Sequence, residues 1–77
     1  MRYWIRNVGS KEEAQDVVLL LRTAGSSLSK PVEITGGIYD PDKKILQLEG
    51  SVEDCVRKRF LDDSRKIGKN YQIEIVG

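Results

Sequence analysis

The sequence contains no histidine and only one cysteine, Cys55, among its 77 residues. Histidine is the commonest general base and metal ligand, and zinc sites need several cysteines or histidines at fixed spacing. A lone cysteine cannot supply the disulfide framework of a small secreted domain. These absences argue against a metal centre, a Cys–His nucleophile and an oxidising compartment. We therefore expect a cytoplasmic protein that is not an enzyme and that holds no metal or cofactor.

The chain also lacks an excess of charge of either sign and a long apolar run. Thirteen Lys and Arg oppose twelve Asp and Glu, for a net charge of +1, whereas dedicated nucleic-acid binders usually carry a clear basic excess. The longest apolar run, Val17–Leu21, is far too short for a membrane span, and no signal peptide is visible. Composition therefore predicts a soluble protein and argues against nucleic acid as its partner.

Two half-chains, residues 1–39 and 43–77, repeat one strand–helix–strand pattern. The predicted elements are strands at 2–8, 32–39, 44–49 and 71–76 and helices at 11–25 and 52–67. Pro41 between two aspartates predicts a tight hairpin that joins the halves. A βαβ unit, a hairpin and a second βαβ unit are typical of the α+β ferredoxin-like (split βαβ) sandwich. We expect one such domain over residues 1–77, with both helices on one face of a four-stranded antiparallel sheet.

Both predicted helices have capping residues at their N-terminal ends and a glycine at their C-terminal ends. Ser10 with Glu13 forms a capping box at the first helix, and Ser51 with Asp54 forms a second capping pair. A glycine in the left-handed conformation commonly ends a helix. The residues expected to end the two helices are Gly25 and Gly68.

Alternation in the strands and helical periodicity together predict the core. Its expected members are Tyr3, Ile5, Ala14, Val17, Leu21, Ala24, Val32, Ile34, Ile38, Leu46, Leu48, Val52, Val56, Phe60, Ile67, Tyr71, Ile73 and Ile75. Cys55, at the edge of the second helical stripe, is expected to be a small core residue. Asp63 falls on the same stripe, and we favour an i to i+4 ion pair with Arg59 over a functional acid.

The same alternation places Trp4 on the sheet face that the helices leave uncovered, which we call the open face. There it lies between two arginines, with glutamates on neighbouring strands. Aromatic residues and arginine are enriched at the centres of protein interfaces. We therefore expect self-association or docking on a protein, in a homodimer as the simplest assembly. The residues expected to bind the partner are Arg2, Trp4, Arg6, Tyr39, Ile45 and Gln47.

Two other functions stay open. RNA or DNA could bind through an exposed aromatic with arginines and the basic end of the second helix; the residues of this alternative are Arg2, Trp4, Arg6, Arg65, Lys66 and Lys69. Against it, the third strand offers no aromatic on the open face. A small-ligand site between associated domains rests on fold analogy alone. The pair Gly36-Gly37 within the second strand predicts a β-bulge.

Overall fold

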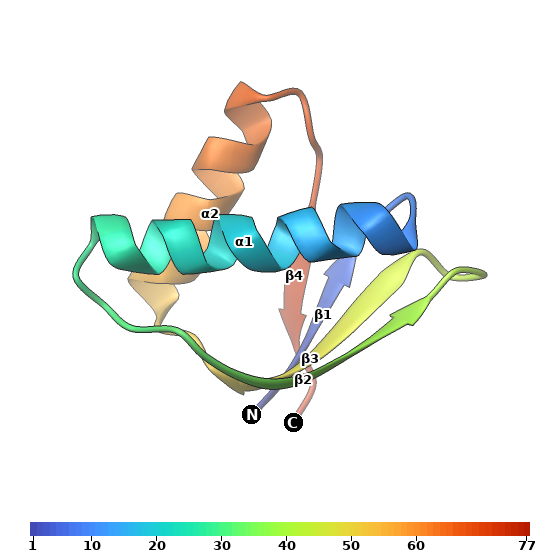
Figure 1. Cartoon of the computed structure of the whole chain (residues 1–77), viewed down its shortest axis with the longest axis horizontal. Helices are drawn as coiled ribbons and strands as arrows, with labels where there is room; N and C mark the ends of the chain where they lie inside the picture. The colour runs from blue at the N-terminus through green and yellow to red at the C-terminus, as the bar shows by residue number, and fades with distance from the viewer.

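The computed structural model describes all 77 residues, and its element order is βαββαβ. The elements are β1 (Arg2–Arg6), α1 (Lys11–Ser27), β2 (Glu33–Asp40), β3 (Ile45–Ser51), α2 (Asp54–Lys66) and β4 (Gln72–Ile75). The strands form one antiparallel sheet in the order β2-β3-β1-β4. Figure 1 shows both helices on the same side of this sheet, with α2 crossing α1 steeply. The predicted ferredoxin-like α+β arrangement is confirmed.

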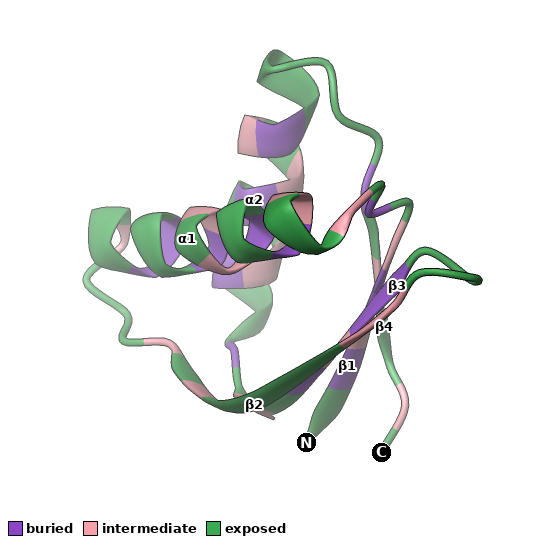
Figure 2. Ribbon diagram, turned by 45° about the vertical axis from the view of Figure 1, so that its right-hand side comes forward, coloured by how far each residue is buried: buried purple, intermediate pink, exposed green.

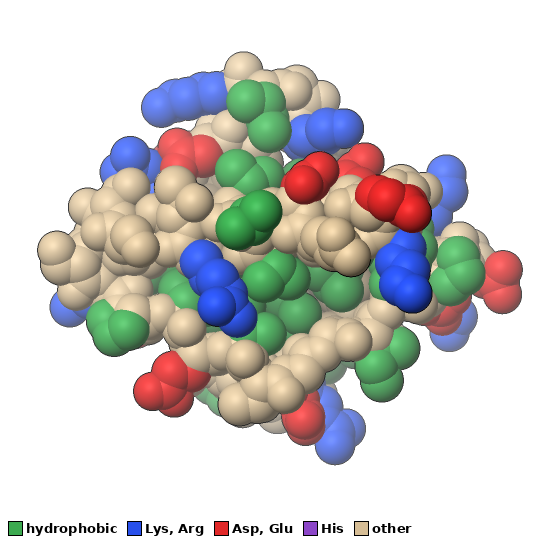
Figure 3. All heavy atoms as spheres, in the orientation of Figure 1, with side chains coloured by type: hydrophobic (Ala, Val, Ile, Leu, Met, Phe, Trp, Pro, Cys, Tyr) green, Lys and Arg blue, Asp and Glu red, His purple; other side chains and the backbone are tan.

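The core lies between the helices and the sheet, as the buried helix faces in Figure 2 show. Tyr3 and Ile5 of β1 point into it, at 1% and 0% exposure. The rings of Phe60 and Tyr71 stack in its centre, with centroids 5.8 Å apart. The buried cluster also includes the predicted α1 residues Ala14, Val17, Leu21 and Ala24. Along the edge strand β2 the cover is thinner, and apolar side chains are visible between α1 and β2 in Figure 3.

The end predicted for α1 at Gly25 is wrong, because the helix continues to Ser27. Gly25 is a buried residue inside the helix. A Cβ there would lie 2.5 Å from the Lys30 carbonyl oxygen and 2.6 Å from Cγ2 of Val32. Glycine is therefore needed at this position, because the segment that follows α1 passes directly against it. The left-handed residue after α1 is Ser29, at φ 54°.

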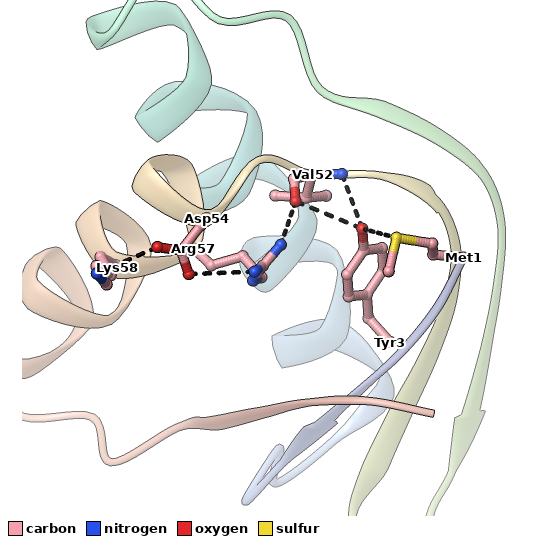
Figure 4. Close-up of polar contacts among 6 residues, drawn as sticks. All are labelled: Met1, Tyr3, Val52, Asp54, Arg57 and Lys58. Atoms are coloured by element: carbon pink, nitrogen blue, oxygen red, sulfur yellow. Dashed lines mark hydrogen bonds and ion pairs between the residues drawn. The ribbon is translucent and has the colours of Figure 1, made fainter. Parts of the chain in front are cut away.

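The second capping pair is also wrong. Ser51 belongs to β3, and the N-cap of α2 is Glu53, which makes no side-chain cap hydrogen bond. Instead, the backbone just before α2 is held by Tyr3 of β1 and by Arg57 of the helix itself (Figure 4). The Tyr3 hydroxyl accepts a hydrogen bond from the Val52 N–H at 3.0 Å, and the Arg57 guanidinium donates to the Val52 carbonyl. A buried tyrosine on β1 therefore fixes the chain just before the helix, but it does not cap the N–H groups of the first turn.

The carboxylate predicted to cap α2 binds helix side chains instead. Asp54 accepts from Arg57 and Lys58, each at 3.1 Å, and both pairs are drawn in Figure 4. The hydrogen bond and charge of Lys58 are the main reason that the pKa of Asp54 lies below its ordinary value. The Arg57 guanidinium lowers it further. The first turn of α2 is thus stabilised through pairs at i+3 and i+4.

The last buried side chain of α2 lies about one turn earlier in the sequence than predicted. The helix ends at Lys66 and Gly68 follows at φ 78°, so Gly68 is confirmed as the residue that ends it. Ile67, expected in the core, is 60% exposed. Ser64 is buried in its place, and the Ser64 hydroxyl donates a hydrogen bond to the Phe60 carbonyl at 2.7 Å.

Two residues on and after α2 that were expected in the core lie at the surface. Cys55 is exposed, so its expected place in the core is wrong. Ile75, near the end of the edge strand β4, is 45% exposed. The i to i+4 pair of Asp63 is confirmed, because Arg59 Nε lies 3.2 Å from its carboxylate. Asp63 therefore has an ordinary structural partner.

A β-bulge reverses the faces of the second half of β2. Ile34 pairs with Gly50 but Gly36 pairs with Glu49, so Thr35 is an extra residue on the β2 side. One extra residue exchanges the inward and outward sets of a strand. The predicted bulge is confirmed, but Ile38, expected in the core, lies on the open face at 68% exposure.

None of the helices is long and apolar enough to cross a membrane.

Candidate functional site

The open face of the sheet consists of three rows of side chains, because strand register fixes which residues lie next to one another. From β2 towards β4, the rows are Gly36, Glu49 and Arg2; then Ile38, Gln47, Trp4 and Glu74; then Asp40, Ile45, Arg6 and Gln72. We call the second of these the middle row. Its two large apolar side chains, Ile38 and Trp4, lie on either side of Gln47. The structure therefore places an apolar centre on the open face, flanked by charged rows.

Both arginines beside Trp4 are paired with carboxylates of neighbouring strands. Arg2 Nε lies 3.2 Å from Glu49 directly across the strand pair, and Arg6 Nη2 lies 3.0 Å from Glu74. The Arg6 guanidinium also lies over the Trp4 ring, 5.6 Å from its centroid. Trp4 is thus half-buried and held on the side of Arg6, while its side towards Arg2 is less covered. The charges of this face are largely neutralised within the face itself.

A hollow of about 430 Å³ opens next to Trp4 on that less covered side. It is lined by side chains of the first two rows, among them Arg2, Trp4, Ile38, Gln47 and Glu49. The space exists because Gly36 has no side chain in the first row, where a Cβ would meet nothing within 4 Å. The hollow has apolar walls and a charged pair at its rim, a combination suited to an apolar side chain of a partner.

Two predicted binding residues do not contribute to the open surface. Tyr39 was expected on the open face, but the bulge turns it towards the helices, where its hydroxyl donates to the Val8 carbonyl at 2.5 Å. Ile45 lies on the open face, as expected, yet it is only 3% exposed. Arg2, Trp4, Arg6 and Gln47 lie together there, as predicted. Ile38 and Gly36 were missed, and the double glycine was the signal that could have indicated the reversal.

The basic end of α2 is neutralised by its own acids. Arg65 pairs with Asp62 at 3.4 Å, and Lys69 reaches Glu13 of α1 at 3.5 Å. Only Lys66 among the three α2-end residues of the nucleic-acid alternative has no ion pair. These residues also form no continuous surface with the arginines of β1, because α2 covers the opposite sheet face (Figure 1). The residues of the nucleic-acid alternative are therefore divided between two sides of the molecule.

A polar cluster at the start of α1 is centred on Glu13. Ser10 is confirmed as the N-cap, because Glu13 N–H donates to Ser10 Oγ at 3.1 Å; the Glu13 carboxylate reaches back as predicted, but it accepts from Gly9 N–H, at 3.3 Å, in place of Ser10 N–H. The same carboxylate accepts a 2.6 Å hydrogen bond from the Tyr71 hydroxyl, beside β4. Glu13 thus joins the first helix to the last strand, which local sequence patterns do not reveal.

The cluster changes the acidity of its members. The Tyr71 hydrogen bond, with help from Gly9 and Lys69, holds the pKa of Glu13 below its ordinary value despite partial burial. Burial, followed by the Glu13 hydrogen bond, raises the pKa of Tyr71. Burial and the charges of Glu13 and Asp40 raise the pKa of Tyr39. Because the carboxylate stays charged and the phenols neutral, the cluster stabilises the fold over the neutral range.

The Tyr71→Phe variant is expected to lose stability in a pH-dependent manner. A carboxylate whose pKa is lowered on folding stabilises the folded state above its unfolded pKa of about 4.3, and loses that contribution as pH falls through the folded value. At pH 7 the variant is expected to lose about 1.5 kcal/mol, the contribution of a hydrogen bond to a charged group. Urea unfolding at pH 7 and in steps from pH 5 to pH 2 measures the difference, which should shrink as Glu13 protonates. A difference independent of pH would contradict the role of Glu13, and Glu13→Gln in the same series serves as the control.

Fold and site together define a small ferredoxin-like domain whose open face carries an apolar centre, a hollow and paired charges. Comparison with protein-family models, curated proteins and solved structures finds no match in any of the three. No group of three or more His, Cys, Asp or Glu side chains is arranged to hold a metal ion.

Proposed function

We propose that the chain is a non-catalytic binding module that contacts protein through the open face, by self-association or by docking on another protein. The observation that supports this most directly is that Trp4 and the exposed Ile38 lie in one row beside a hollow on an otherwise charged face. Exposed apolar patches with polar rims are typical of protein interaction sites, and tryptophan and arginine are frequent at their energetic centres. A reducing, cytoplasmic setting suits the free, exposed Cys55.

The arrangement of charge supports a protein partner over a phosphate backbone. Arg2 and Arg6 already bind Glu49 and Glu74, so a nucleic acid would have to displace these carboxylates and approach them closely. Binding to phosphate draws its affinity from the release of counterions around unpaired cations. Of the thirteen basic residues, eight are in ion pairs. Nucleic-acid binding stays a prediction that the same experiments can test.

The hollow itself offers little for catalysis. Its one carboxylate, Glu49, is tied to Arg2, and an acid–base mechanism commonly needs two groups whose pKa values differ. The chain has no histidine to supply the second group. We therefore assign the hollow a role in recognition, where an apolar wall and a charged rim select a partner side chain.

Substitution Trp4→Ala is expected to weaken binding to the protein partner about 30-fold, because a tryptophan at an interface centre commonly contributes 2 kcal/mol or more. Proteins retained by the immobilised chain from a cell extract are identified first. Their affinities, and that of the free chain for itself, are then measured with purified wild-type and Trp4→Ala protein. Trp4 is the only tryptophan, so its fluorescence reports binding directly.

The matched control is Leu19→Ala, which removes an exposed apolar side chain from α1, on the other side of the sheet, and should leave these affinities within about twofold of wild type, as is usual for substitutions outside an interface centre. Equal affinities for wild type and Trp4→Ala would argue against the proposal. So would binding only to RNA or DNA, with an affinity that falls steeply as salt is added.

A further inference from the structure

We propose that the occupant of the open face is a second copy of this chain, with Ile38 of each copy packed on Trp4 of the other. The inference rests on the proposed function and specifies its partner. The two copies would be related by a two-fold axis that runs along β3 above Gln47. Three features of the open face lead to this arrangement: the register of the middle row, the shape beside Trp4 and the balance of charge.

The register makes the middle row self-complementary. Gln47 pairs with Ile38 on one side and with Trp4 on the other, and neighbouring strands lie about 4.8 Å apart. Ile38 and Trp4 are therefore equidistant from Gln47. A two-fold rotation about a line above Gln47 places Ile38 of one copy over Trp4 of the other, and the reverse. Such an isologous contact uses one surface twice and closes as a dimer.

The shape of the surface fits this contact. Ile38 projects from the sheet at 68% exposure, and the hollow of about 430 Å³ lies against Trp4. The hollow extends from Trp4 across β3 to Gly36, where a Cβ would meet nothing within 4 Å. In each half of the dimer the projecting isoleucine of one copy thus meets the less covered side of the tryptophan of the other. Aligned packing of two sheet faces at about 10 Å is an established way to bury such side chains.

The charge of the face suits a second copy as well. Each copy carries a net charge of only +1, so two copies repel one another weakly. Arg2 and Glu49, in the row next to the middle row, are already paired at 3.2 Å. On the axis, the Glu49 side chains of the two copies face one another, each paired with Arg2 of its own copy, and in the third row the same rotation places Asp40 of each copy opposite Arg6 of the other. A strongly acidic or basic partner would find no such match on this face.

The position of Gly36 provides a sharp test. Gly36→Arg fills the space beside Trp4, while its Cβ meets nothing within 4 Å and its φ is not positive, so the variant is expected to fold. Sedimentation equilibrium over a wide concentration range should show dimer for wild type and at least a tenfold weaker association for Gly36→Arg. The matched control, Gln72→Arg, adds the same charge to the same face outside the contact and should associate like wild type.

Complementation tests the reciprocal contact itself. Ile38→Glu and Trp4→Lys each spoil both contacts of a homodimer, so each protein alone should be monomeric. In a mixture of the two, one contact retains Ile38 and Trp4, and the other joins the two introduced side chains, which are of opposite charge. The mixture is therefore expected to form a heterodimer, detected by native mass spectrometry. Circular dichroism of each variant checks its fold, and Gly36→Arg keeps the test valid if Trp4→Lys does not fold.

The outcomes separate this inference from the proposed function. A wild-type chain that stays monomeric, yet binds another protein in a Trp4-dependent way, overturns the second copy as occupant and leaves the docking function standing. A dimer that Gly36→Arg does not weaken, or variants that do not complement, overturns the arrangement around Gln47. A monomer that binds no protein overturns both proposals.

Discussion

The Gly50→Ala variant is expected to lose about 3 kcal/mol or more of its free energy of unfolding. Gly50 in β3 has φ 151°, a conformation that residues with a side chain rarely adopt. A Cβ at this position would overlap the Glu33 carbonyl oxygen and lie 3.0 Å from the Ile34 Cα. Backbone atoms cannot rotate away as a side chain can, so the pairing of β2 with β3 must open. Urea unfolding followed by circular dichroism measures the loss.

Gly36→Ala is the matched control for this prediction. Gly36 lies two residues beyond Ile34 on the same strand pair, and its Cβ would meet nothing. Alanine there is expected to be neutral or to stabilise by up to about 0.5 kcal/mol, because it restricts the unfolded chain. A domain of this size has a stability of roughly 5–10 kcal/mol, so the two variants should be easy to distinguish. Equal stabilities would contradict the tight approach at Gly50.

Phe60→Ala is expected to cost about 3–5 kcal/mol, whereas Ile67→Ala should cost less than about 1 kcal/mol. Phe60 is fully buried and stacks on Tyr71, with planes 9° apart. Truncation would leave a cavity at the centre of the core. Ile67 follows the last residue of α2 and is 60% exposed, so its truncation removes little packing. Chemical denaturation of the two variants measures both values.

This pair of variants distinguishes the structure from the sequence pattern. Helical periodicity places Phe60 and Ile67 on one stripe, seven residues apart, and predicts similar costs for both. In the structure the helix ends at Lys66, and the last buried residue of the stripe is Ser64 and not Ile67. A loss at Ile67→Ala comparable to that at Phe60→Ala would contradict this end of the helix.

Much of the fold could be predicted because its signals are local. Strand alternation put Tyr3 and Ile5 in the core and Trp4 outside it, and the structure agrees. The errors occurred where a distant residue replaces a local signal. The chain just before α2 is held by Tyr3 of β1, and the helix has no side-chain cap of its own. Gly25 does not end its helix; it lets the backbone at Lys30 pass close to the helix.

The candidate site was predicted in part, for a related reason. Arg2, Trp4, Arg6 and Gln47 lie on straight strands, so a period of two residues assigns their face correctly. Tyr39 was misplaced and Ile38 missed because one extra residue at Thr35 reverses the faces of the rest of β2. The double glycine indicated a bulge, but not which residue would be the extra one. Only pairing with β3 decides that.

By itself, the sequence determined the element order, the open face and the position of Trp4 upon it, because hydrophobic periodicity and turn residues act over a few positions of the chain. Only the tertiary structure decided that Ile38 would join Trp4 on that face and that Gly36 would leave a hollow between them. The surface we propose for docking consists of residues from three strands, from Arg2 to Glu49. Such a surface depends on strand register and on the bulge, which are set by hydrogen bonds between segments far apart in the chain.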